Sequence, residues 1–281
     1  MRKLAIGAAL SGALALTGLT APLASAATTS PDLVFSDVTV NKGKAIVVGT
    51  TAAVKVPVTY TLTRPSDLVI DYKTTFVGVL LYRGKLSDMT NSIDPDAAPT
   101  CTTTATTDTT VTEACTETIT VDPWDSLHAS ADATTWKAGG FYSHVDEDSD
   151  DSDGHVSYGY GYDIWGNLGT LQIKRAARLT ADASPEPVVK GKTLTVKGAL
   201  TRARWATGRY EGYADQSVTL QFRPVGSTTY TTVKTVMSGS GGALSTTVKA
   251  TKSGYFRYQF AGTATTGAKT STGDYVKVDA G

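Results

Sequence analysis

Apolar and polar residues alternate with a period of two along many short segments, and this pattern constrains the fold more than any other feature. One face of a predicted strand carries Val54, Val56, Val58, Tyr60 and Leu62. Successive side chains of a strand point to opposite sides, so such a segment would bury one face. The chain also contains 47 Thr, a β-branched residue that favours strands. No segment after residue 26 has a convincing helical period, so we predict an all-β protein.

The second half shows the same alternation with clearer turn signals. Apolar positions recur in 194–196, 218–222 and 256–260, and turn residues occupy 224–226 and 239–242. About seven short strands with this spacing are typical of an immunoglobulin-like sandwich. We therefore predict two antiparallel β-sandwich domains, of which the C-terminal one is immunoglobulin-like.

The overall net charge of zero conceals two oppositely charged halves. Residues 27–173 carry 8 basic and 20 acidic side chains, a balance of −12. Residues 174–281 carry 16 basic and 6 acidic side chains, a balance of +10. Such asymmetry indicates two units with different surroundings. We predict an acidic β domain over 27–174 and a basic immunoglobulin-like domain over 175–281.

The first 26 residues have the layout of a secretory signal peptide. Arg2 and Lys3 are followed by an apolar stretch over 4–19 and by the small residues Ala24, Ser25 and Ala26. A membrane anchor is the alternative, but the stretch is short and ends before a cleavage motif. No later segment has the length to span a bilayer. We predict cleavage after Ala26 and a secreted, extracellular protein without a membrane span.

The predicted export makes the two cysteines interpretable. Cys101 and Cys115 are the only cysteines of the sequence, and outside the cytosol a disulfide is the default state of such a pair. The alternative is a thiolate nucleophile, which needs a nearby base to lower its pKa. Because no His lies beside either Cys in the sequence, we predict a disulfide.

Several stretches resemble a family of secreted actinobacterial proteins. They are 183–192, 200–205, 217–223, 254–258 and the N-terminal 49–53. The resemblance implies a signal peptide, an N-terminal β domain with one Cys pair, and a C-terminal immunoglobulin-like domain. Members of the family are often labelled calcium-binding proteins, so the resemblance also implies calcium as a ligand.

An acidic run is the sharpest local feature, with six carboxylates in residues 146–153. The predicted calcium ligands are its aspartates Asp146, Asp148, Asp150, Asp151 and Asp153. Ca²⁺ prefers several oxygen ligands, and a bound cation would relieve the repulsion between these carboxylates. The run is not an EF-hand, because Tyr160 stands where that loop requires Glu. A solvated acidic loop without metal is the alternative.

Two further patterns flank this run. His144 and His155 would approach each other across a hairpin and could hold a transition metal with a nearby Asp, or they are surface histidines beside a turn. Tyr158, Tyr160 and Tyr162 would form one aromatic stripe on a strand. Such a stripe stacks on a ligand or, more often, packs on a neighbouring element.

Residues 201–216 form a segment rich in arginine and aromatic residues. The candidate binding residues are Arg202, Arg204, Trp205, Arg209 and Tyr210. Arginine beside aromatic rings favours cation–π pairing and anion recognition, so an anionic cell-wall polymer is a candidate partner. Alternatively, the segment folds over its own domain or docks on the acidic one.

No sequence motif for catalysis is present. We predict a secreted, non-enzymatic binding protein that binds calcium through the acidic run and a partner such as another extracellular protein. One alternative is an adhesion module that binds the cell wall through its basic domain. Another is a hydrolase whose active-site residues are dispersed in the sequence. Export and near-neutral charge argue against a nucleic-acid partner.

Overall fold

The computed structural model describes residues 31–71, 74–148 and 157–281. In that part of the chain every regular element is a strand or a short 3-10 turn, which confirms the predicted all-β class. The alternating pattern explains the result, because Val56 and Val58 are fully buried while Lys55, the residue before Val56, is exposed. Among the described residues, no helix is long and apolar enough to cross a membrane.

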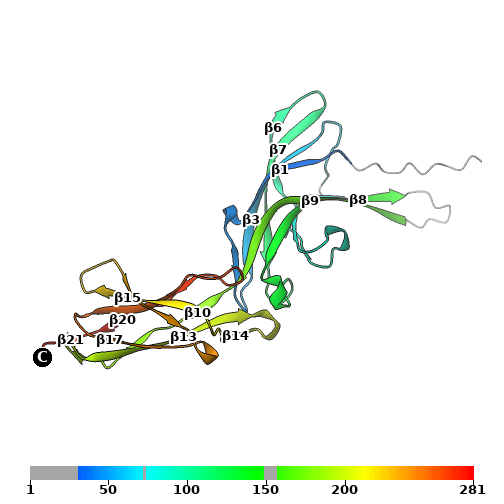
Figure 1. The fold of residues 1–281 in the computed structure, drawn as a ribbon. Coiled ribbons are helices and arrows are strands. Elements are labelled where there is room, and N and C mark those ends of the chain that lie inside the picture. The colour runs from blue at the N-terminus through cyan, green and yellow to red at the C-terminus, as the bar shows by residue number, and fades with distance from the viewer. Residues whose placement is uncertain (1–30, 72–73, 149–156) are drawn as a thin grey trace, which may run out of the picture. The chain divides into compact units, whose positions relative to one another are not determined.

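The N-terminal half contains two sheets (Figure 1). The first has the strand order β1 (Val34–Val40), β3 (Val54–Pro65), β7 (Thr110–Val121) and β6 (Thr100–Thr106). The second has the order β2 (Ile46–Val48), β9 (Ser157–Arg175), β8 (Thr135–Asp148), β4 (Thr75–Tyr82) and β5 (Ser92–Ile93). All pairs are antiparallel except β2 with β9, which is parallel.

This strand order is that of an immunoglobulin domain. In immunoglobulin lettering the first sheet reads A, B, E, D and the second reads A′, G, F, C, C′. The sequence predicted a β-sandwich here without this topology. The usual cysteine signal links strands B and F, whereas Cys101 and Cys115 lie on β6 and β7, the adjacent D and E strands.

The C-terminal half also forms two sheets. In the first, the central strand β13 (Thr193–Arg204) pairs with β10 (Ala177–Leu179), β11 (Asp182–Ser184), β14 (Arg209–Gly212) and β17 (Ala243–Lys249). The second comprises β16 (Thr231–Met237), β15 (Ser217–Pro224), β18 (Gly254–Phe260), β19 (Lys269–Thr270) and β20 (Asp274–Val276). A short parallel pair joins β12 (Val188–Val189) to β21 (Val278–Asp279).

The topology of this half confirms the predicted immunoglobulin-like sandwich, with strands A, B and E facing C′, C, F and G. The predicted turn at 239–242 contains η5 (Ser240–Gly242) and leads into β17. Gly242 has a φ of 79°, and a Cβ there would overlap the carbonyl oxygen of Leu200. Only glycine fits this turn at no steric cost.

Each half has its own buried cluster of apolar side chains. Fully buried members in the N-terminal half include Ile46, Val48, Val56, Val58, Leu62, Val79, Ile119 and Ile173. Those in the C-terminal half include Leu194, Val196, Leu200, Val218, Leu220, Tyr258 and Val276. Burial of such a side chain contributes about 1.5–3 kcal/mol, so the alternating faces are the main source of stability.

Four further 3-10 turns connect the strands: η1 (Asn41–Gly43), η2 (Leu86–Asp88), η3 (Ser130–Asp132) and η4 (Trp205–Thr207). In η4, Trp205 joins the buried cluster of the N-terminal half. Its indole N–H donates to the carbonyl oxygen of Gly49 at 2.9 Å. This contact gives Trp205 a partner for its only polar group.

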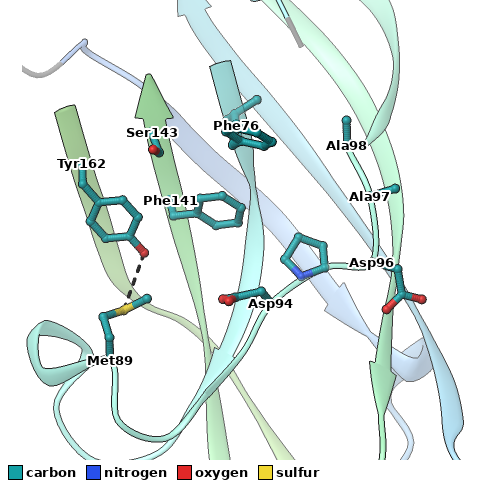
Figure 2. Close-up of a pocket in the computed structure, with 11 residues that line it drawn as sticks. Phe76, Met89, Asp94, Asp96, Ala97, Ala98, Phe141, Ser143 and Tyr162 are labelled. Carbon is teal, nitrogen blue, oxygen red and sulfur yellow. Dashed lines mark hydrogen bonds between the residues drawn. The ribbon is translucent and has the colours of Figure 1, made fainter. Parts of the chain in front are cut away.

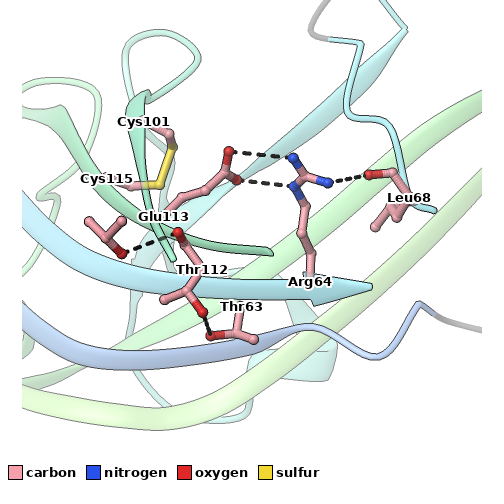
Figure 3. A network of polar contacts seen from close by, with 8 residues as sticks. Thr63, Arg64, Leu68, Cys101, Thr112, Glu113 and Cys115 are labelled. Carbon is pink, nitrogen blue, oxygen red and sulfur yellow. Dashed lines mark hydrogen bonds and ion pairs between the residues drawn. A yellow bond between two sulfur atoms is a disulfide. The ribbon is translucent and has the colours of Figure 1, made fainter. Parts of the chain in front are cut away.

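The predicted disulfide is confirmed, since Cys101 and Cys115 are bonded across β6 and β7 (Figure 3). Beside it, the Arg64 guanidinium donates to both carboxylate oxygens of Glu113, at 3.1 and 3.5 Å. The same guanidinium donates to the carbonyl oxygen of Leu68 at 2.6 Å. These bonds tie β3 to β7 and to the segment that follows β3 (Figure 3).

Candidate functional site

Strand register places three side chains in one row across the second sheet of the N-terminal half. Phe76 on β4 lies opposite Ser143 on β8, and Ser143 lies opposite Tyr162 on β9. In a neighbouring row, Phe141 on β8 lies opposite Gly78 on β4. Residues two apart on a strand share a face, so Phe141 and Ser143 lie on the same side of the sheet.

Glycine at position 78 allows this arrangement. A Cβ at Gly78 would lie 3.2 Å from the ring of Phe141, so the missing side chain lets the ring approach the backbone of β4. The next rings remain accessible, with Phe76 52% exposed and Tyr162 44% exposed. Large exposed apolar groups that cluster, rather than occur singly, mark interaction surfaces.

The segment between η2 and β6 builds the other side of a cavity of about 420 Å³, which we call the aromatic pocket (Figure 2). Its lining residues are Phe76, Val77, Met89, Asp94, Pro95, Asp96, Ala97, Ala98, Phe141, Ser143 and Tyr162. The Tyr162 hydroxyl donates to the sulfur of Met89 at 3.6 Å. This bond joins the sheet to the opposite wall.

The two aspartates of the aromatic pocket have different surroundings. Asp96 accepts hydrogen bonds from the amide and the hydroxyl of Thr120, at 2.8 and 2.6 Å. Asp94 has no hydrogen bond or ion pair within the part of the chain that the structure describes. Partial desolvation raises the pKa of the Asp94 carboxyl. Desolvation, and then the charge of Asp94, raise the pKa of Tyr162.

The aromatic pocket therefore combines a hydrogen-bond acceptor, the Asp94 carboxylate, with the faces of aromatic rings. Among the described residues, its lining has three aromatic rings and one carboxylate without a partner, that of Asp94, but no Lys, Arg, His, Asn or Gln side chain. A cation is attracted both to the face of an aromatic ring and to a carboxylate. The arrangement can hold a positively charged group on an apolar body.

A buried carboxyl, Glu117, lies beside this face at the edge of β4 that β5 leaves unpaired. The amide of Val79 donates to Glu117 Oε1 at 2.8 Å, and the Tyr60 hydroxyl lies 3.4 Å from Glu117 Oε2. β5 pairs with β4 only at Leu81 and Tyr82, so no strand covers this edge of β4 at Val79. The bond to Glu117 gives the Val79 amide a partner there. Burial raises the pKa of Glu117 to about 8, although the two hydrogen bonds oppose the shift.

The predicted calcium ligands fall mostly outside the described residues. Asp146 and Asp148 belong to the end of β8, whereas Asp150, Asp151 and Asp153 lie outside that part of the chain, as does His155. His144 lies on β8 with its ring 5.4 Å from that of Tyr142. Within the described ranges, no group of three or more His, Cys, Asp or Glu side chains is placed to hold a metal.

The predicted arginine-rich segment is a hairpin of β13, η4 and β14. Trp205 is only 4% exposed, so it packs in a core and does not form a ligand-facing surface. Tyr210 is half-buried beneath the guanidinium of Arg178, which lies 3.7 Å from the ring centroid. Arg209 is exposed on β14. Arg202 and Arg204 line a separate pocket.

Sequence reasoning singled out Tyr162 but missed Phe76, Asp94 and Phe141. These residues are far apart in the sequence, and only the register of β4, β8 and β9 brings the rings together. One signal was present in the sequence. Phe76 and Tyr82 lie on one face of β4 and Val77 lies on the other, so both faces of the strand carry apolar residues. The first of these faces is covered at Tyr82 and left open at Phe76.

No protein-family model and no curated protein sequence matches this chain. Solved structures with a similar course of the chain include the D00–D0 domain of intimin, with 13% identity and a TM-score of 0.27 over 88% of this chain and 100% of that one. Domains A168–A170 of titin have 7% identity and a TM-score of 0.24, over 88% and 68%. The ectodomain of mouse nectin-like molecule 4 has 14% identity and a TM-score of 0.23, over 88% and 66%. Because these TM-scores are low, the fold assignment rests on the strand order alone.

Proposed function

We propose that this chain is a secreted, non-enzymatic binding protein whose aromatic pocket receives a positively charged, partly apolar segment of an extracellular protein. The observation that carries the proposal is the carboxylate of Asp94, which has no partner in the part of the chain that the structure describes, beside the rings of Phe76, Phe141 and Tyr162. A lysine or arginine side chain has both features that this pocket accommodates, an apolar stem and a cationic head.

The charge of the surrounding half supports a cationic partner. Residues 27–173 have a balance of −12, and such a field attracts positively charged partners and speeds their association. Within the pocket, a cation beside Asp94 would favour the ionised carboxylate and offset its desolvation. Binding of the partner therefore lowers the pKa of Asp94.

A neutral sugar fits the aromatic pocket less well. Sugar hydroxyls both donate and accept, so a sugar site needs donors as well as acceptors. The side chains of this pocket supply two hydroxyls as donors, and that of Tyr162 already donates to Met89. The excess of acceptors favours a ligand that donates, such as an ammonium or guanidinium group.

Titration of the full chain with 4-phenylbutylammonium, followed by NMR, tests the location of binding. The proposal predicts that the largest shift changes occur at Phe76, Asp94, Phe141 and Tyr162. Tyr162→Ala should weaken binding about tenfold. Tyr275→Ala is the matched control, because Tyr275 is 41% exposed in the other half, and it should leave binding unchanged. Equal effects of the two substitutions would contradict the proposal.

Calcium binding by the acidic run stays a separate proposal, supported by the density of carboxylates over residues 146–153. Ca²⁺ that binds only the folded state raises the melting temperature. The metal-stripped wild type should therefore melt at a higher temperature in millimolar Ca²⁺, and a triple Asn variant of Asp150, Asp151 and Asp153 should not. Identical melting of both proteins in Ca²⁺ would argue against a calcium site.

A further inference from the structure

A second pocket, of about 270 Å³, contains three arginines and one carboxylate. Its lining residues are Ser130, Arg175, Arg202, Ala203, Arg204, Glu211 and Gly212, and we call it the arginine pocket. Arg202 and Arg204 are two residues apart on β13, so their side chains leave the same face of that strand. Arg175 is the last residue of β9.

Arg175 is a buried cation with an unused donor. Its side chain is 8% exposed, and its Nε has no hydrogen-bond partner in the structure. Among the described residues, no carboxylate pairs with it. Desolvation, followed by the charges of Arg202 and Arg204, lowers the pKa of Arg175. An unpaired buried charge is costly unless a counter-ion offsets it.

The other two arginines are held in place without neutralising Arg175. The Arg202 guanidinium lies 3.9 Å from the centroid of the Tyr213 ring, and stacking of this kind fixes its plane. Arg204 forms an ion pair of 2.8 Å with Glu211. Because Glu211 is committed to Arg204, the arginine pocket keeps two positive charges without a carboxylate partner among the described residues.

We propose that Arg175, Arg202 and Arg204 form a binding site for a phosphate group. Guanidinium donors match the geometry of phosphate oxygens and bind them in a bidentate way. The Arg175 guanidinium, which lines the pocket without a carboxylate partner among the described residues, gives the anion a charged donor, and the stacked plane of Arg202 gives it a preorganised one. This site goes beyond the proposed function, because it lies on other strands and binds an anion, whereas the aromatic pocket receives a cation.

The cavity is larger than a single phosphate ion, so the phosphate has two candidate sources. One is free inorganic phosphate, and the other is a phosphodiester of an extracellular polymer. The two share the anionic oxygens that the arginines recognise. Inorganic phosphate and poly(glycerol phosphate) are therefore the two probes, and the tighter ligand identifies the source. Either one bound at these arginines supports the site.

The test is calorimetric titration of the full chain with each probe, at constant ionic strength set with sodium chloride. Wild type should bind at least one probe, and Arg202→Gln should lose about tenfold in affinity. Arg178→Gln is the matched control, because Arg178 also stacks on a tyrosine ring but does not line the arginine pocket. It should bind as wild type does.

A second variant keeps the test independent of folding defects in Arg202→Gln. Arg175→Met removes the unpaired charge and keeps an apolar stem, so without phosphate it should melt at or above the temperature of wild type. It should gain no thermal stability from phosphate. The inference is overturned if neither probe binds wild type, if Arg202→Gln binds as tightly as wild type, or if phosphate stabilises Arg175→Met as much as wild type.

Discussion

Glu117 shows how one residue links the edge of a strand to the pH dependence of the fold. Its carboxyl accepts from the Val79 amide, and burial raises its pKa to about 8. The folded state therefore holds this proton at pH values where the unfolded chain has released it. The contribution of this proton to the free energy of unfolding is present at acidic pH. It is lost as pH rises toward about 8, by at most about 1.4 kcal/mol per pH unit.

Glu117→Gln should remove this dependence, because glutamine has nearly the same shape, keeps an acceptor for the Val79 amide and does not ionise. We expect the variant to melt at a higher temperature than wild type near pH 8, with the gap closing toward about pH 5. Thermal melts of both proteins across this range measure the difference. A gap that is constant with pH would refute the role of Glu117.

Asp94 shows what a sequence cannot indicate about a single residue. It lies in an irregular segment after β5, where an aspartate is unremarkable. Its importance comes from neighbours on β8 and β9 and from the lack of a partner among the described residues. Arg175 is similar: the sequence placed it at a domain boundary, whereas its side chain is buried in the arginine pocket.

Among the elements, the β6–β7 hairpin depends most on a covalent bond. β6 is at the edge of its sheet, and most of its side chains are exposed, so packing contributes little to holding it. The disulfide closes a loop with a sequence separation of 14. In the chain-entropy model such a loop contributes about 3 kcal/mol.

A double Ala variant of Cys101 and Cys115 should therefore lose about 3 kcal/mol of unfolding free energy in urea titrations. Wild type treated with a reductant should approach the same value. The reductant itself should not affect the variant, which is the control. A reductant that leaves wild-type stability unchanged would show that the crosslink contributes little.

Strand positions were predicted well where one face is buried. Leu194, Val196 and Leu220 are fully buried as their alternation indicates. Proline has no N–H for a ladder bond, so inside a sheet it needs a position where that bond is not required. Pro57 lies on the interior strand β3, but β1 pairs with β3 only from Val58 onward.

At the scale of the molecule, Trp205 is expected to matter for stability and not for ligand binding. Its buried ring and its bond to Gly49 predict that Trp205→Ala loses about 3–5 kcal/mol of unfolding free energy. Trp124, which is 55% exposed, is the matched control, and its Ala variant should lose less than about 1 kcal/mol. Chemical denaturation measures both values. Similar losses in the two variants would contradict the assignment.

Fold class, the disulfide and the C-terminal topology followed from patterns local in the sequence. The immunoglobulin order of the N-terminal half did not, because it depends on which strands pair across the domain. The aromatic pocket needs Phe76, Phe141 and Tyr162 to meet through register. The arginine pocket needs Arg175 to meet β13. Sites built by tertiary contact are therefore the part that the sequence left open.

The central claim is that the aromatic pocket selects a positive charge through Asp94. The most direct measurement compares the dissociation constants of 4-phenylbutylammonium and its neutral counterpart 4-phenylbutanol, for wild type and for Asp94→Asn. Wild type should bind the ammonium about tenfold more tightly than the alcohol, and Asp94→Asn should bind the two about equally. Equal affinities in wild type, or a preference that survives in Asp94→Asn, would contradict the claim.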